Sequence, residues 1–140
     1  MDKIWLEHYD KGVPGDINPD YYNNLADYLD KNFKKHEELP AFSNLGHTLT
    51  YADINEKSRD FAAFLQNELG LKKGERFAIM LPNLLQYIIA MFGAIRAGLV
   101  VVNVNPLYTT RELAHQLKDS GAKALLVLAN FASVAQMALP

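Results

Sequence analysis

From Arg76 to Leu128 the sequence alternates between short apolar runs and helical patterns, and this alternation limits the fold more than any other feature. The runs RFAIML, LVVVNV and KALLVL are continuously apolar apart from their ends, whereas NLLQYIIAMFGAIRA and TRELAHQLKDS have helical periodicity. Strands without an inside–outside alternation are typical of parallel sheets that are covered on both faces. The β-α-β-α-β order therefore predicts an α/β fold with a parallel sheet.

The sequence before Arg76 predicts an irregular arm, a helix and a β-hairpin rather than further parallel strands. Glycine and proline at 12–15 predict an irregular N-terminal arm over residues 1–18, followed by a unit over 19–140. Pro19 suits the first position of a helix that Asn18 would cap. The runs AFSNL and TLTY flank Gly46 and predict a β-hairpin. The fold expected is thus an N-terminal helix and hairpin followed by the parallel unit.

Two later helices carry sequence signals at both ends. Thr50 with Asp53, and Thr109 with Glu112, have the spacing of capping boxes at helix starts. A glycine, Gly121, is expected to end the second of these helices. The helix between the first two apolar runs is apolar on most of its circumference, which predicts that it is buried between layers.

Composition excludes several classes of function. The 140 residues carry a net charge of -2 and no long basic run, which argues against nucleic-acid binding. The sequence has no cysteine, so disulfides and thiolate metal sites are excluded. The four histidines are scattered without metal-ligand spacing, and no metal site is predicted. The N-terminus lacks the apolar core of a signal peptide, and polar residues interrupt the 77–104 stretch, so a cytoplasmic protein without a spanning helix is expected.

The candidate site lies where the three predicted parallel strands end, because open α/β sheets bind ligands beyond the carboxyl ends of their strands. One of these ends has the unusual sequence Asn103-Val-Asn-Pro-Leu-Tyr108. Its polar residues could line a ligand channel, or they could simply form a turn; composition alone favours the turn. No catalytic residue is predicted: Ser58 lacks a G-x-S-x-G context, and the dispersed glycines form no phosphate loop.

Several longer stretches resemble a known family. LPNLLQY, NVNPLYT and RELAHQLKDSGA, together with IWLEHY near the start, are similar to the N-terminal part of the adenylate-forming acyl-CoA synthetases. Within that superfamily the chain is most similar to the bacterial long-chain fatty acid-CoA ligases, over nearly its whole length. The resemblance implies an incomplete N-terminal subdomain of the AMP-binding fold.

The resemblance also implies a function for the parent enzyme. Such ligases activate a fatty acid with ATP and Mg²⁺ to acyl-AMP and then transfer the acyl group to CoA. The family's phosphate loop and catalytic lysine would lie beyond residue 140, so the fragment by itself is expected to be inactive and to bind none of these cofactors strongly. The site residues that the resemblance implies line the path of the CoA pantetheine arm; they are Asn105, Pro106, Leu107 and Tyr108.

Partners follow from the same expectation. The remainder of the synthetase chain would be the main partner, and exposed sheet edges would favour self-association. Two other interpretations stay open: a free-standing α/β module that binds an apolar or nucleotide ligand, and a piece that associates peripherally with membranes.

Overall fold

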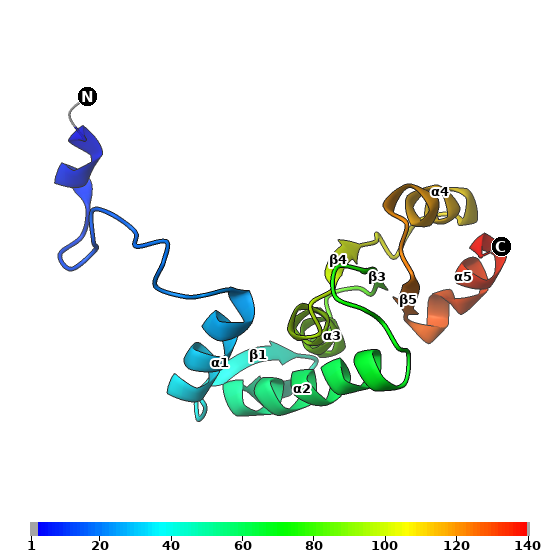
Figure 1. The fold of residues 1–140 in the computed structure, drawn as a ribbon, viewed down its shortest axis with the longest axis horizontal. Helices are drawn as coiled ribbons and strands as arrows, with labels where there is room; N and C mark the ends of the chain where they lie inside the picture. The colour runs from blue at the N-terminus through cyan, green and yellow to red at the C-terminus, as the bar shows by residue number, and fades with distance from the viewer. Residues whose placement is uncertain (1–2, 140) are drawn as a thin grey trace.

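An extended N-terminal segment precedes the packed part of the molecule. The computed structural model describes residues 3–139, and the first of these, residues 3–21 (hereafter the extension), reach away from the remaining elements (Figure 1). The extension begins with a short 3₁₀ helix, Ile4–His8, which the sequence did not predict. Its hydrogen bonds stay within residues 3–21, and Lys3 Nζ lies 2.6 Å from Asp16 Oδ1. Local contacts alone therefore shape this segment.

Helix α1 spans Leu25–Lys35, so the predicted start at Pro19 is wrong. Asn24 is the N-cap, and its side chain accepts a hydrogen bond from the Asp27 backbone N–H at 2.9 Å. The Asp27 carboxylate in turn accepts from the backbone of Asn23. The Asn18 side chain instead accepts from the N–H of Asp20, and the Asn18 carbonyl accepts from the N–H of Tyr21, so Asn18 closes a local turn. The helix therefore begins after Asn24, where two side chain–backbone hydrogen bonds form the cap, and not at Pro19.

The predicted hairpin is confirmed. Strands β1 (Pro40–Asn44) and β2 (His47–Thr50) pair antiparallel around a turn with Gly46 at a φ of 81°. Helix α2 (Tyr51–Asn67) follows directly, and the capping box of Thr50 and Asp53 is present as expected. The hairpin and α1 therefore lead into the helix that covers the sheet.

The parallel sheet is also confirmed. Strands β3 (Arg76–Met80), β4 (Val100–Asn103) and β5 (Ala124–Val127) form a three-stranded sheet in the order β4-β3-β5, with both pairs parallel. Central β3 is buried from its second residue onward, as expected for a strand covered on both faces. The strands β4 and β5 are only partly buried because each has one neighbour.

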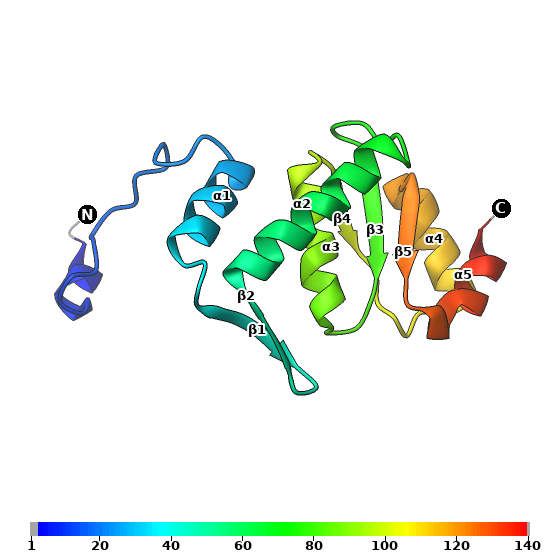
Figure 2. The same cartoon turned by 90° about the horizontal axis from the view of Figure 1, so that it is seen from below.

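Helices cover both faces of this sheet (Figure 2). Phe77 and Ile79 of β3 pack with α2 and α3 (Leu85–Arg96), whereas Ala78 and Met80 pack with α4 (Thr110–Ser120) and α5 (Ala132–Ala138). The predicted capping box and the left-handed Gly121 are both present at the ends of α4. The sequence did not predict α5 or the 3₁₀ turn Ala129–Phe131 before it, because neither has a side-chain cap.

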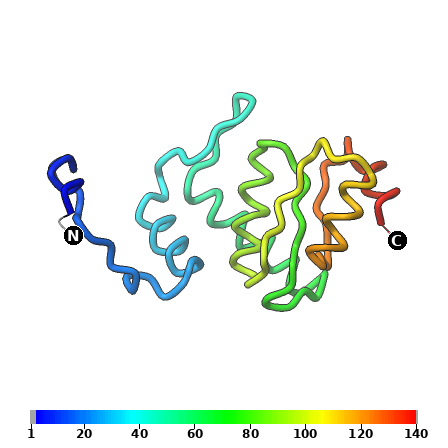
Figure 3. Tube along the Cα trace, turned by 90° about the horizontal axis from the view of Figure 1, so that it is seen from above, coloured from blue at the N-terminus to red at the C-terminus, as the bar shows by residue number. Residues whose placement is uncertain are grey.

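The molecule is elongated, and its two ends carry different elements. The extension lies at one end, whereas α4, β5 and α5 lie at the other (Figure 3). Within the described residues no helix is both long and apolar enough to cross a bilayer.

Candidate functional site at the carboxyl rim of the sheet

The carboxyl ends of the strands form a rim where the chain leaves toward opposite faces. After β3 the chain enters α3 on one face, whereas after β4 and β5 it enters α4 and α5 on the other. Loops that diverge in this way open a crevice between neighbouring strand ends, which is where α/β sheets bind ligands. The predicted position of the candidate site thus coincides with the switch point of this sheet.

The Asn-Pro loop after β4 is held by hydrogen bonds of its own. The Asn105 side chain accepts from the backbone N–H of Leu107 at 3.0 Å, and the Asn105 carbonyl accepts from the N–H of Tyr108 at 3.1 Å. This Asx turn needs a short polar side chain at Asn105, and Pro106 suits the following position. Asn105 therefore has a structural role as a turn former.

Asn103 ties two helices to the end of β4. Its Oδ1 accepts from the hydroxyl of Tyr87 on α3 at 2.8 Å, and its backbone carbonyl accepts from Gln116 Nε2 on α4 at 2.9 Å. Val104, between the asparagines, is buried, and its N–H donates to the Ile79 carbonyl. The polar residues that end this apolar strand thus fix the loop against both helical layers.

The four residues implied by the family resemblance divide into distinct environments. Asn105 is exposed, and Tyr108 packs partly against the cluster around Val104 and Leu113. Leu107 is 80% exposed. A shallow groove of about 240 Å³ continues from the loop along α4; it is lined by Tyr108, Glu112, His115, Gln116 and Asp119. The loop therefore offers an exposed apolar tip beside a polar groove.

A second hollow at the rim was not predicted. It has a volume of about 450 Å³ and lies between the ends of β3 and β5 and the tip of the β1–β2 hairpin. Leucines dominate its lining, and three polar side chains join them, those of Asn44, His47 and Gln86. Sequence reasoning could not find it because the hairpin tip lies far from both strands along the chain.

Glu112 belongs to a helix cap rather than to a catalytic group. Its carboxylate accepts hydrogen bonds from the Thr109 hydroxyl at 2.7 Å and the Thr109 backbone at 2.8 Å. These two bonds lower the pKa of Glu112 from its ordinary value and favour the charged form.

Among residues 3–139, no group of three histidine or acidic side chains lies close enough together to hold a metal ion.

A partly buried polar network between α1, α2 and α3 was not predicted from the sequence. Arg96 is 7% exposed in its side chain, and its guanidinium donates to Asp30, to Ser58 Oγ and to Asn55 Oδ1. Burial raises the pKa of Asp30, but hydrogen bonds from Arg96 and Arg59 outweigh burial and leave this pKa below its ordinary value. The sequence signal was an arginine in an otherwise apolar helix. The network holds α1 in place and lies away from the rim.

Comparisons with known proteins place this geometry in a family. The model of the AMP-binding enzyme family matches residues 29–139, which is most of the chain. The chain belongs to the AMP-binding enzyme family.

Curated members of this AMP-binding family are similar over almost the whole chain. A long-chain-fatty-acid--CoA ligase of Escherichia coli O157:H7 is 54% identical over 132 residues, which are 94% of this chain and 24% of that protein. The ligase of the same name from Bacillus subtilis is 38% identical over 126 residues, or 90% of this chain and 22% of that protein. The chain therefore spans about a quarter of the length of these AMP-binding relatives.

Solved structures of AMP-binding enzymes show the same fold. A benzoate CoA ligase from Burkholderia xenovorans LB400 superposes with a TM-score of 0.77 at 27% identity, over 82% of this chain and 23% of that one. A fatty acyl CoA synthetase from Mycobacterium tuberculosis has a TM-score of 0.75 at 29% identity, over 81% and 23% of the two chains. The expected incomplete N-terminal subdomain of the AMP-binding fold is thus confirmed.

Proposed function

We propose that this chain forms the N-terminal part of a long-chain fatty acid-CoA ligase. The observation that carries the proposal is the 54% identity to the E. coli ligase over 94% of the chain, well above the 35% to a 4-coumarate:CoA ligase of Petunia hybrida over 76%. The activity belongs to a protein about four times as long, since the chain spans 24% of its relatives. A free-standing binding module would not require such similarity.

The reaction proposed for the complete protein has two steps. The fatty-acid carboxylate attacks the α-phosphate of ATP, which gives acyl-AMP and releases pyrophosphate. The CoA thiol then attacks the acyl carbon, loses its proton, and expels AMP. We propose that other parts of the protein carry out the adenylation step.

We assign to this chain a part in the second step. The loop of Asn105, Pro106, Leu107 and Tyr108 would line the path by which the pantetheine arm of CoA approaches the acyl-AMP. Its position at the rim supports this role, and so does the exposed Leu107, which offers apolar surface to the methylene groups of the arm. The Asx turn of Asn105 would hold this surface in a fixed position before CoA binds.

A chimera tests the proposed function. Residues 1–140 would replace the aligned segment of the E. coli ligase, and hexadecanoyl-CoA formation would be measured with ATP and CoA. We expect an activity within about tenfold of the parent ligase. A tenfold loss corresponds to ~1.4 kcal/mol of activation free energy, which is the size expected from slightly altered packing at the new contacts. A folded chimera that forms no acyl-CoA would contradict the proposal. The unmodified ligase and a ligase that lacks the segment are the controls.

A further inference from the structure

Gln116 on α4 has a side-chain amide of which only one end is hydrogen-bonded. Its Nε2 donates to the backbone carbonyl of Asn103 at 2.9 Å. Its Oε1 is buried, and no donor among the described residues reaches it. A buried oxygen without a hydrogen bond lowers the stability of the fold, because it has lost water and gained no partner. An apolar side chain of similar size would avoid this loss, so stability alone does not explain a glutamine at this position.

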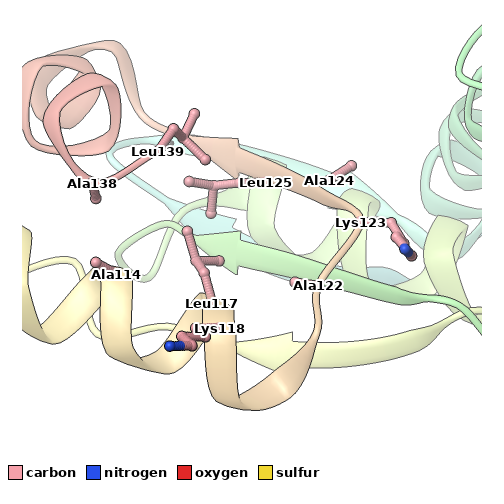
Figure 4. A pocket seen from close by; sticks show the side chains of 9 residues that line it. All are labelled: Ala114, Leu117, Lys118, Ala122, Lys123, Ala124, Leu125, Ala138 and Leu139. Carbon is pink, nitrogen blue, oxygen red and sulfur yellow. The ribbon is translucent and has the colours of Figure 1, made fainter.

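The direction of its side chain separates Gln116 from the packing face of α4. Ala114 and Leu117 of the same helix line a hollow where α4 faces β5 and α5 (Figure 4). Gln116 instead reaches the end of β4, and together with Tyr108 it lines the shallow groove beside the Asn-Pro loop. Gln116 therefore acts on this loop and not on the contact between α4 and α5.

The bond from Gln116 joins the two ends of the segment that contains the loop. Asn103 is the last residue of β4, and residues 104–109 connect it to α4. The Asn103 side chain also accepts from the hydroxyl of Tyr87 on α3, which packs on the other face of the sheet. Two helices on opposite faces thus fix the strand end from which the loop departs. A loop that is held in place before its ligand arrives loses less conformational entropy when the ligand binds.

We propose that Gln116 is a positioning residue for the transfer of the acyl group to CoA. Through Asn103 it holds the loop of Asn105 to Tyr108 in the place where the pantetheine arm passes, although its own oxygen stays unpaired. Gln116 itself touches no substrate. The inference rests on the proposed function, since it assigns a residue to the second step of that reaction.

The variant Gln116→Met separates positioning from stability. In the chimeric ligase it removes the bond to Asn103 and the unpaired oxygen together, and the flexible methionine fills nearly the same space. The carbonyl of Asn103 belongs to an exposed residue, so water can replace the lost donor. We therefore expect the thermal unfolding temperature to stay the same or to rise.

The kinetic effect of Gln116→Met should be confined to CoA. We expect the KM for CoA to rise about fivefold, which is the effect of one lost hydrogen bond. The kcat of thioester formation should stay within about twofold, because the bond holds the loop both before and during the reaction. Fatty-acid-dependent exchange of pyrophosphate into ATP takes place before CoA reacts, so it should not change.

The variant Tyr87→Phe tests the same tie from the other face of the sheet. It removes the hydroxyl that bonds Asn103 and keeps the ring, so the same rise in the KM for CoA is expected. Two matched controls should leave this KM unchanged. Gln66→Met makes the same substitution at an exposed position in the last turn of α2. Tyr22→Phe removes a hydroxyl that accepts from Asn32 of α1.

Hydrogen exchange measures the position of the loop without any activity. The backbone N–H groups of Leu107 and Tyr108 both donate to Asn105. Exchange would be followed by mass spectrometry on peptides that cover residues 104–109 of the chimera. We expect it to be faster by about threefold or more in Gln116→Met and in Tyr87→Phe, and unchanged in the two controls.

Two results would overturn the inference. If Gln116→Met lowers the unfolding temperature and slows both half-reactions alike, the residue is structural. If neither the KM for CoA nor the exchange of the loop changes, the bond to Asn103 does not position the loop. Failure of the proposed function gives a different result, because the unmodified chimera would then form no acyl-CoA.

Discussion

At the scale of single residues, the contact between α2 and α3 is set by Gly93. A Cβ atom on Gly93 would lie 2.8 Å from Phe61 Cδ1 and 3.0 Å from the backbone oxygen of Ser58. Alanine in place of a mid-helix glycine normally stabilises by about 1 kcal/mol. Here the backbone oxygen cannot move aside easily, so we expect Gly93→Ala to destabilise by about 1–3 kcal/mol. Urea unfolding measures the change, and a stabilised variant would show that the helices are less tightly packed.

The ionised carboxylate of Asp30 makes the free energy of unfolding depend on pH. Its pKa is lowered in the folded state by Arg96 and Arg59, so the charged carboxylate stabilises the fold above its ordinary pKa. This contribution is lost as the pH falls through the lowered folded-state pKa. We expect Asp30→Asn to unfold more easily at neutral pH and the difference from wild type to shrink below about pH 4. A difference that stays constant down to acid denaturation would exclude Asp30 as its source.

At the scale of elements, the helix starts that were predicted correctly are those with a side-chain capping box in the sequence. The starts of α2 and α4 were predicted because each has a threonine followed three positions later by an acidic residue. In each pair, the side chain of one residue accepts a hydrogen bond from the backbone N–H of the other. The start of α1 was missed because two asparagine signals compete, and the stronger of them depends on the Asp27 carboxylate. Helix α5 has no side-chain cap and forms by packing against α4, which no local pattern reveals.

The cap of α4 also supports the candidate loop. Thr109 follows Tyr108 directly, and its side chain accepts from the backbone of Glu112. Thr109→Ala should cost about 0.5–2 kcal/mol of stability. The adjacent Thr110→Ala leaves the cap intact and should cost clearly less. Thermal unfolding compares the two, and equal losses would mean that the capping box adds nothing to α4.

At the scale of the whole molecule, the order of strands and helices was predictable and the tertiary contacts were not. Continuous apolar runs between helical patterns were sufficient for a parallel sheet, since few other arrangements bury them. The rim followed from the same rule. The hollow beside the hairpin tip and the network around Arg96 join residues more than 30 positions apart, and single-sequence patterns carry no information on such pairs.

The role of the loop after β4 is the central functional claim, and Leu107→Trp in the chimeric ligase tests it most directly. Two half-reactions would be measured: fatty-acid-dependent exchange of pyrophosphate into ATP, and thioester formation from CoA. If the loop lines the pantetheine path, the bulky side chain obstructs thiol entry, so thioester formation falls at least about tenfold while exchange persists. Equal loss in both half-reactions, together with lower thermal stability, would contradict the claim and leave Asn105 and Pro106 as turn formers alone.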